Sequence, residues 1–127
     1  AIPTDVMSPS MGQATLGIET TTDPKIIEIV KVLNDKNAEI ESKIERGFVD
    51  TLQGGCQVPI GVKATILDEK SVKIDAIVGL PDGTEYIKES KVADITTFEI
   101  AGKEFAQDFI AKGAVELLKR AEAMAFK

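Results

Sequence analysis

The order of apolar and polar residues divides the chain into four helical stretches and three strand-like ones. In residues 21–34, Asp23 is a suitable N-cap and Pro24 suits the first helical position. The apolar side chains here recur at helical spacing, at Ile26, Ile29, Val30 and Leu33. The pattern therefore predicts a helix with one apolar face.

A second helix is predicted over residues 34–55, where an apolar residue returns every four positions. That stripe consists of Ile40, Ile44, Phe48 and Leu52. Asn34 or Asp35 can cap its start, and Gly54 or Gly55 can take the left-handed conformation that ends a helix. Cys56 is therefore expected on the turn that leads into a strand.

Three stretches of alternating pattern follow, in residues 58–68, 71–80 and 84–92. A short link between the first two allows a hairpin, and Pro81–Gly83 is a strong turn signal before the third. The third stretch is more polar, as an edge strand would be. The alternating apolar positions of the first two stretches are Ile60, Val62, Ala64, Ile66, Val72, Ile74, Ala76 and Val78.

Helical spacing returns near the C-terminus, where Thr96 and Glu99 fit a capping box. The apolar face there consists of Phe98, Ala101, Phe105 and Phe109. Gly113 interrupts the pattern, which resumes over residues 114–126. The order helix, helix, three strands, helix, helix predicts an α+β fold, with a three-stranded antiparallel sheet covered on one face by helices.

Composition narrows the class of protein. The 127 residues, 43% hydrophobic and 28% charged, suit one globular domain. No apolar run approaches the roughly 20 residues that span a bilayer, and the N-terminus is unlike a secretory signal, so we expect no membrane partner. The formal net charge is −6 and there is no basic stripe, which argues against a nucleic-acid partner.

The chain has a single cysteine, Cys56, and no histidine. One thiol makes no internal disulfide, so a reducing, cytoplasmic location is expected. Without an imidazole there is no Ser-His or Cys-His nucleophile pair, and one thiolate leaves no zinc site of the usual kind. Carboxylate-only magnesium or calcium sites stay open, but no loop has the spacing of an EF-hand, and we assign no metal site.

Cys56 allows two interpretations. A lone cysteine is ordinarily a small, buried, inert residue. Here it follows Gly54 and Gly55 on a predicted loop, where functional side chains concentrate and where glycine lets a bulky group approach the backbone. No basic residue adjoins it in the sequence, so its thiol needs a strong electrophile or activation from elsewhere.

Residues 54–61, "GGCQVPIG", resemble the cofactor-attachment loop of the hydroxymethylbilane synthase family, also called porphobilinogen deaminase. The preceding "IERGFVDTLQ" resembles the helix end that runs into that loop, and "PSMGQATLGIE", residues 9–19, resembles a second family motif. Ala14 and Thr15 depart from that motif, where the family has glycine and alanine. "VGLPDG" and "FIAKGAVELL" also resemble family segments, so the resemblance covers essentially the whole chain in order.

The resemblance implies that Cys56 carries a dipyrromethane cofactor through a thioether, with Gly54, Gly55 and Gln57 beside it in the loop. A soft sulfur nucleophile suits this bond, because loss of ammonia from porphobilinogen leaves an electrophilic methylene carbon. The family's enzymes are transferases that join four porphobilinogen units into the linear tetrapyrrole hydroxymethylbilane, in porphyrin and heme biosynthesis. The cofactor stays bound as a primer.

The family's enzymes are longer, and the resemblance is to their C-terminal part. It implies that residues 1–22 match the strand that returns to the first domain, residues 23–35 a connecting helix, and residues 36–127 the cofactor-carrying domain. The catalytic aspartate and the carboxylate-binding arginines lie outside this chain, so we expect no catalytic residue in it and an inactive isolated fragment. The implied partners are domains 1 and 2 of the same enzyme, porphobilinogen and the polypyrrole intermediates. We expect residues 14–19 to borrow a strand partner, from another copy or by folding back.

A second class of function stays open: a small, non-enzymatic α+β interaction module with an inert Cys56. Arg46 either contacts the cofactor loop or an interdomain carboxylate, or it is a solvated helix residue. Gln13 is either an interdomain hydrogen-bonding residue or part of a turn. Four carboxylates are interpreted as solvated and are not assigned to catalysis: Asp68, Glu69, Asp75 and Asp82.

Overall fold

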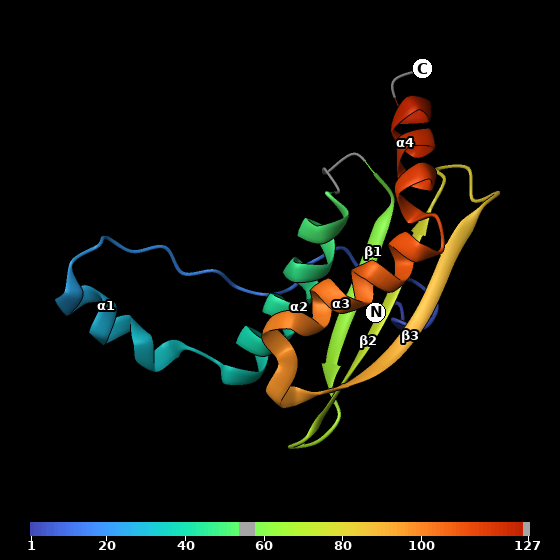
Figure 1. Ribbon diagram of the computed structural model, residues 1–127. Helices are drawn as coiled ribbons and strands as arrows, with labels where there is room; N and C mark the ends of the chain where they lie inside the picture. Colours follow the sequence, from blue (N-terminus) through green and yellow to red (C-terminus); the bar gives the residue numbers. More distant parts are fainter. Residues whose placement is uncertain (54–57, 126–127) are drawn as a thin grey trace.

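The computed structural model describes residues 1–53 and 58–125. It contains a three-stranded sheet, a layer of helices on one face of that sheet, and a segment that extends away from both layers (Figure 1). Strands β1 (Ile60–Ile66), β2 (Ser71–Gly79) and β3 (Tyr86–Asp94) form an antiparallel meander in the order β1-β2-β3. The predicted α+β fold is confirmed, and the polar third strand lies at an edge as expected.

Helices α2 (Lys36–Leu52) and α3 (Phe98–Ala111) lie across one face of the sheet, and α4 (Ala114–Ala125) follows α3 (Figure 1). Asp35 caps α2, because its carboxylate accepts the N–H of Ala38. The apolar stripe predicted for α2 is buried against the sheet and α3. In β1 and β2 the predicted alternation is also the burial pattern, since Val62, Ala64, Val72, Ile74, Ala76 and Val78 are all buried.

An aromatic cluster fills the core between α2 and α3. Phe48 meets Phe109 edge to face with ring centroids 5.0 Å apart, and Phe105 lies 5.6 Å from Phe48. The two helices are in close backbone contact at Gly102, where an added Cβ would lie 2.0 Å from the backbone oxygen of Ile44. Only glycine permits this crossing.

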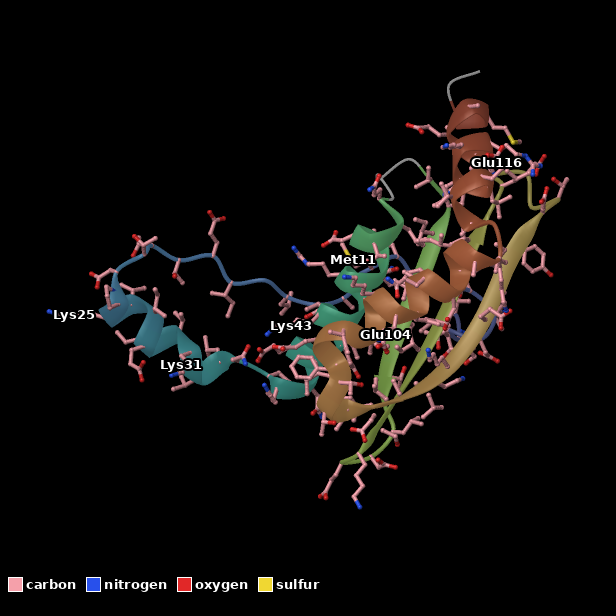
Figure 2. The ribbon with its side chains drawn as sticks, viewed as in Figure 1. Met11, Lys25, Lys31, Lys43, Glu104 and Glu116 are labelled. Carbon is pink, nitrogen blue, oxygen red and sulfur yellow. The ribbon has the colours of Figure 1, made fainter. Side chains whose placement is uncertain are left out.

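The extended segment, residues 13–33, is called the arm below. It contains α1 (Pro24–Val30) and a 3-10 turn (Lys31–Leu33). Asp23 caps α1 as predicted, by accepting the N–H of Lys25. No residue of α1 or of the 3-10 turn is buried, so the predicted apolar face exists but has no cover within the described chain. Figure 2 shows Lys25 and Lys31 on the arm, well away from the sheet.

Two predicted helix ends differ from the structure. Thr96 does not begin α3: it lies in a 3-10 turn, where the carboxylate of Asp94 accepts both its N–H and its hydroxyl. Thr97 precedes α3 without a side-chain cap, so the predicted capping box is wrong. At the end of α2 the left-handed residue is Gln53, with φ of 54°, one position before the predicted glycines.

Residues 14–19 form no strand, and Leu16 is 92% exposed. The prediction that this stretch folds back onto a strand partner is therefore wrong. The segment that does fold back is residues 8–12, called the docked segment below, whose Pro9 carbonyl accepts the N–H of Val62 at 2.9 Å. Partnership of residues 14–19 with another copy stays a prediction.

Candidate functional site

The two elements on either side of the cysteine loop lie next to each other. Helix α2 ends at Leu52 and is closed by Gln53, and the described chain resumes at Val58, two residues before β1 begins at Ile60. Four residues predicted to form the site, Gly54, Gly55, Cys56 and Gln57, lie outside the described residues. Their roles therefore stay predictions, and the structure describes what surrounds both ends of the loop.

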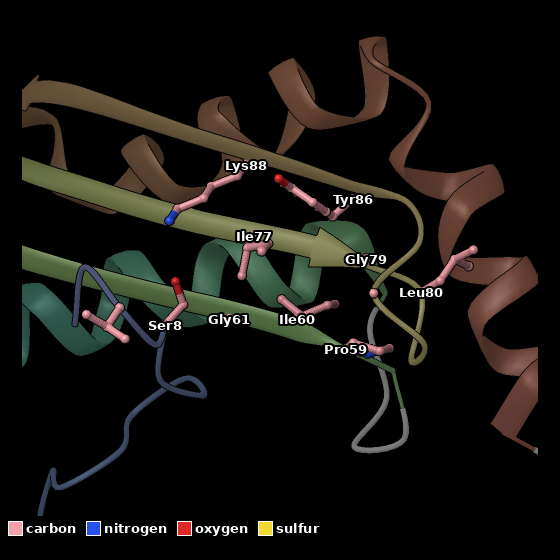
Figure 3. Close-up of a pocket in the computed structure, with 11 residues that line it drawn as sticks. Ser8, Pro59, Ile60, Gly61, Ile77, Gly79, Leu80, Tyr86 and Lys88 are labelled. Carbon is pink, nitrogen blue, oxygen red and sulfur yellow. The ribbon is translucent and has the colours of Figure 1, made fainter. Parts of the chain in front are cut away.

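An open cavity of about 310 Å³ begins at Pro59, on the face of the sheet opposite the helices (Figure 3). Ile60 of β1 and Ile77 of β2 supply apolar walls, and Tyr86 and Lys88 of β3 supply a ring and a cation. This volume falls within the ~300–1,000 Å³ usual for small-molecule sites. The residues combine an apolar surface with one positive charge.

Lys88 differs from its charged neighbours along β3 in its ion pairing. Glu89 forms an ion pair with Lys112, and Lys91 forms one with Asp108 at 3.1 Å. Among residues 1–53 and 58–125, the ion pairs leave Lys88 without a carboxylate partner. Its amine is therefore available to an anion that enters the cavity.

Two acidic residues adjoin the cavity lining in the sequence, Asp82 before Gly83 and Glu85 before Tyr86, and each already has a partner. Arg120 of α4 donates to Glu85 at 2.6 Å, and this hydrogen bond holds the pKa of Glu85 below its ordinary value. The N–H of Thr84 likewise lowers the pKa of Asp82, beside Gly83 of the cavity lining. Both carboxylates stay ionised at neutral pH while bound to their own partners.

The docked segment forms one side of this region. In Figure 3, Ser8 lies over Gly61 of β1, where an added Cβ would come within 2.7 Å of the Ser8 Cβ. Met11, labelled in Figure 2, belongs to the same segment. The next residue, Gly12, donates its N–H to a carboxylate oxygen of Glu45 at 2.7 Å. The segment thus contacts both α2 and β1, the two elements that flank the loop.

The turn after the docked segment contains one of the departures from the family motif. Ala14 has a φ of 67°, in the left-handed region that favours glycine. A glycine would adopt this conformation without the steric cost of a Cβ. Gln13 is exposed and its N–H bonds to the carbonyl of Ser10, which matches the turn interpretation of this residue.

Other residues singled out from the sequence lie apart from the cavity. Arg46 is exposed on α2, in keeping with a solvated helix residue. Asp68 accepts the N–H groups of Lys70 and Ser71 within the β1–β2 turn, and Asp75 accepts the Ser90 hydroxyl. Within residues 1–53 and 58–125, no cluster of carboxylates or thiols is arranged to hold a metal ion. No helix in those ranges is long and apolar enough to cross a bilayer.

Two residues were not predicted from the sequence. Glu45 is buried beside the apolar stripe of α2, and a signal was present, since Glu41 and Glu45 stand four residues apart on one helix face. Like charges at that spacing repel unless each has a partner. Lys88 had no such signal, because only the pairing of its neighbours across the fold distinguishes it.

Comparison with known proteins identifies relatives over the whole chain. Residues 39–111 match the family described as "Porphobilinogen deaminase, C-terminal domain". The chain is similar to the porphobilinogen deaminases of Aliarcobacter butzleri (69% identity over 99% of this chain), Campylobacter curvus (55% over 94%) and Sulfurimonas denitrificans (51% over 97%). These alignments cover 40%, 38% and 39% of the three relatives, so the chain spans about two fifths of their length.

Proposed function

The chain belongs to the porphobilinogen deaminase family, and from this we propose that it is the part of such an enzyme that carries the dipyrromethane cofactor on Cys56. The complete enzyme would join four porphobilinogen units into hydroxymethylbilane with loss of ammonia. The observation that carries the proposal is the position of "GGCQVPIG" inside residues 39–111, the region that matches the family's C-terminal domain.

The described residues next to the loop fit a pyrrole that bears carboxylates. Pro59 follows Cys56 by three residues, a span of at most about 11 Å, so a group attached to the thiol can reach the cavity. Ile77 and Tyr86 offer apolar and aromatic surface to a ring, and Lys88 offers an unpaired cation to a carboxylate. Gly54, Gly55 and Gln57 are proposed as the other residues of the attachment loop.

The chemistry assigned to this chain is the attachment step. The Cys56 sulfur forms a bond to the aminomethyl carbon of a pyrrole, the carbon–nitrogen bond breaks, and the thiol proton leaves with the ammonia. When bound, a dipyrromethane supplies the pyrrole end to which further units are joined. The cavity residues then hold the anchored end and shield one side of it from water, with Lys88 as a carboxylate contact.

The proposed partners are the two preceding domains of the same enzyme, porphobilinogen and the growing polypyrrole. The catalytic aspartate and the substrate-binding arginines would come from those domains. The arm supports this assignment, because it presents an uncovered apolar surface at Leu16, Ile18, Ile29 and Val32. Residues 1–22 would return to the first domain, residues 23–35 would connect, and residues 36–127 would form the cofactor-carrying domain.

A hybrid enzyme tests the proposal: the Aliarcobacter butzleri protein in which the region matched by this chain is replaced by this chain. We expect its intact mass to exceed the sequence value by one dipyrromethane on Cys56, and we expect hydroxymethylbilane as product. Cys56→Ser should remove both the adduct and the activity. Thr51→Ser keeps the hydroxyl that donates to the Gly47 carbonyl and should retain both.

The competing function, an interaction module with an inert cysteine, gives the opposite result. The proposal would be overturned if the folded hybrid enzyme carried no adduct on Cys56 and if Cys56→Ser had the same intact-mass increment and activity as Thr51→Ser. The isolated chain is expected to be inactive in either case, so its activity does not separate the two functions.

A further inference from the structure

Glu45 is the one polar or charged residue that is buried among those the structure describes, with 4% of its surface exposed. A buried carboxylate is unfavourable unless hydrogen bonds replace its water. Here both oxygens are used: Oε1 accepts the N–H of Ala64 at 3.0 Å, and Oε2 accepts the N–H of Gly12 at 2.7 Å. The amine of Lys63 lies 3.8 Å from Oε1. One side chain therefore joins α2, β1 and the docked segment.

Two further contacts hold the docked segment in the same place. The Pro9 carbonyl accepts the N–H of Val62, on the edge of β1 that faces away from β2. Ser8 packs where Gly61 has no side chain. The segment is thus fixed at both of its ends, by β1 near Pro9 and by Glu45 at Gly12.

Glu41 provides an internal comparison. It stands one turn before Glu45 on α2, accepts the N–H of Ile66 at 3.1 Å, and lies 3.9 Å from Lys63. Both glutamates therefore connect α2 to the edge of β1. Among the described contacts, only Glu45 also binds the docked segment.

We propose that Glu45 is a positioning residue that fastens the docked segment to the domain carrying Cys56. It thereby holds the polypeptide that arrives from the rest of the enzyme in a fixed place relative to the cofactor loop. The fastening itself is a property of this chain alone. Its consequence for turnover rests on the function proposed above.

The fastening is tested by hydrogen exchange on the 127-residue chain. Glu45→Gln keeps an oxygen that can accept from Ala64, but its amide nitrogen cannot accept from Gly12. Because a hydrogen bond to a charged group is stronger than one between neutral groups, we expect exchange of the docked segment to rise at least about tenfold. The matched variant Glu41→Gln should leave that exchange unchanged.

Gly61→Ala gives an independent route that leaves Glu45 intact. Its Cβ would meet Ser8, so it should also release the docked segment. Circular dichroism establishes that each variant is folded. Wild-type exchange in the docked segment of both folded Glu45→Gln and folded Gly61→Ala would overturn the fastening.

The consequence for turnover is tested in the hybrid enzyme. Glu45→Gln should retain the adduct on Cys56 and lower kcat about tenfold, whereas Glu41→Gln should keep the wild-type kcat. Equal kcat values for the two variants would overturn this part. If instead the wild-type hybrid carries no adduct, the proposed function fails while the exchange result still decides the fastening.

Discussion

The packed region, residues 36–53 and 58–125, and the arm, residues 13–33, contain similar apolar patterns but differ in burial. Phe48 and Phe109 are completely buried in the packed region, whereas Leu16 and Val32 of the arm are 92% and 83% exposed. Helical spacing of apolar residues predicts an apolar face in both. The difference shows that such a pattern identifies a surface that needs cover and does not say which part of the protein supplies it.

Local signals are sufficient to define α1 without burial. Asp23 caps its start and Pro24 occupies its first position, yet the helix spans seven residues and buries none of them. A helix this short is marginal in water by itself, because packing supplies most helical stability. The arm is therefore the part of the chain whose stability depends most on a partner.

A single added methyl group should produce the largest contrast between the two regions. At Gly102 the new Cβ of Gly102→Ala would lie 2.0 Å from the backbone oxygen of Ile44, a clash that no side-chain movement relieves. Overpacking typically lowers the free energy of unfolding by about 1–3 kcal/mol, and we expect a larger loss here. Gly17→Ala in the arm meets no atom within 4 Å and should change the free energy of unfolding by less than about 0.5 kcal/mol. Urea unfolding of both variants measures the difference.

A comparable loss in Gly17→Ala would show that the arm is packed in solution. An unchanged Gly102→Ala would show that α2 and α3 separate easily at their crossing. Either result would remove the contrast between the regions.

Truncation of one apolar side chain in each region should give the next largest difference. Phe48→Ala removes a ring that contacts Phe105 and Phe109, and should destabilise the chain by about 3–5 kcal/mol. Ile29→Ala in α1 removes a side chain that is 66% exposed and should have an effect within about 0.5 kcal/mol. Thermal and urea unfolding provide the measurement. In the hybrid enzyme, where we propose that the preceding domains cover the arm, Ile29→Ala should become destabilising.

The smallest effect is expected at the junction of the two regions. Hydrogen bonds from Lys43, and then from Asn34, lower the pKa of Glu39 from its ordinary 4.5 to about 2. Because the folded pKa is lowered, the stabilising contribution is complete above pH 4.5 and is lost as the pH falls towards 2. Stability of the wild type and of Glu39→Gln should therefore converge across that interval, and NMR titration of the Glu39 carboxyl should show the low pKa. A midpoint near 4.5 would contradict the Asn34 and Lys43 contacts.

Much of the fold was predictable because its elements repeat strong local patterns. The stripe from Ile40 to Leu52 and the alternation in β1 and β2 each report burial on one face, and all of those elements formed. The capping box failed because Asp94, two residues before Thr96, binds that threonine more directly. Asp94 and Glu99 are both candidate acceptors for the Thr96 N–H, and the spacing of residues alone does not decide between them.

The site was less predictable because its contacts join distant parts of the chain. The sequence predicts Cys56 as the cofactor-bearing residue through a specific motif, and this stays a prediction because the residue lies outside the described ranges. Glu45 and Lys88 acquire their significance only in three dimensions, one by binding Gly12 and Ala64, the other by lacking the partner that its neighbours have. The four-residue spacing of Glu41 and Glu45 indicates that each carboxylate needs a partner, but it does not identify that partner.

The outward edge of β1 also affects association between copies of this chain. Its N–H groups at Val62, Ala64 and Ile66 are all taken, by the docked segment, by Glu45 and by Glu41. An exposed strand edge is a template on which sheets grow into aggregates. The contacts of the docked segment, Glu45 and Glu41 therefore leave these three N–H groups unavailable to a strand from another molecule. At high concentration they disfavour intermolecular pairing at this edge of the sheet.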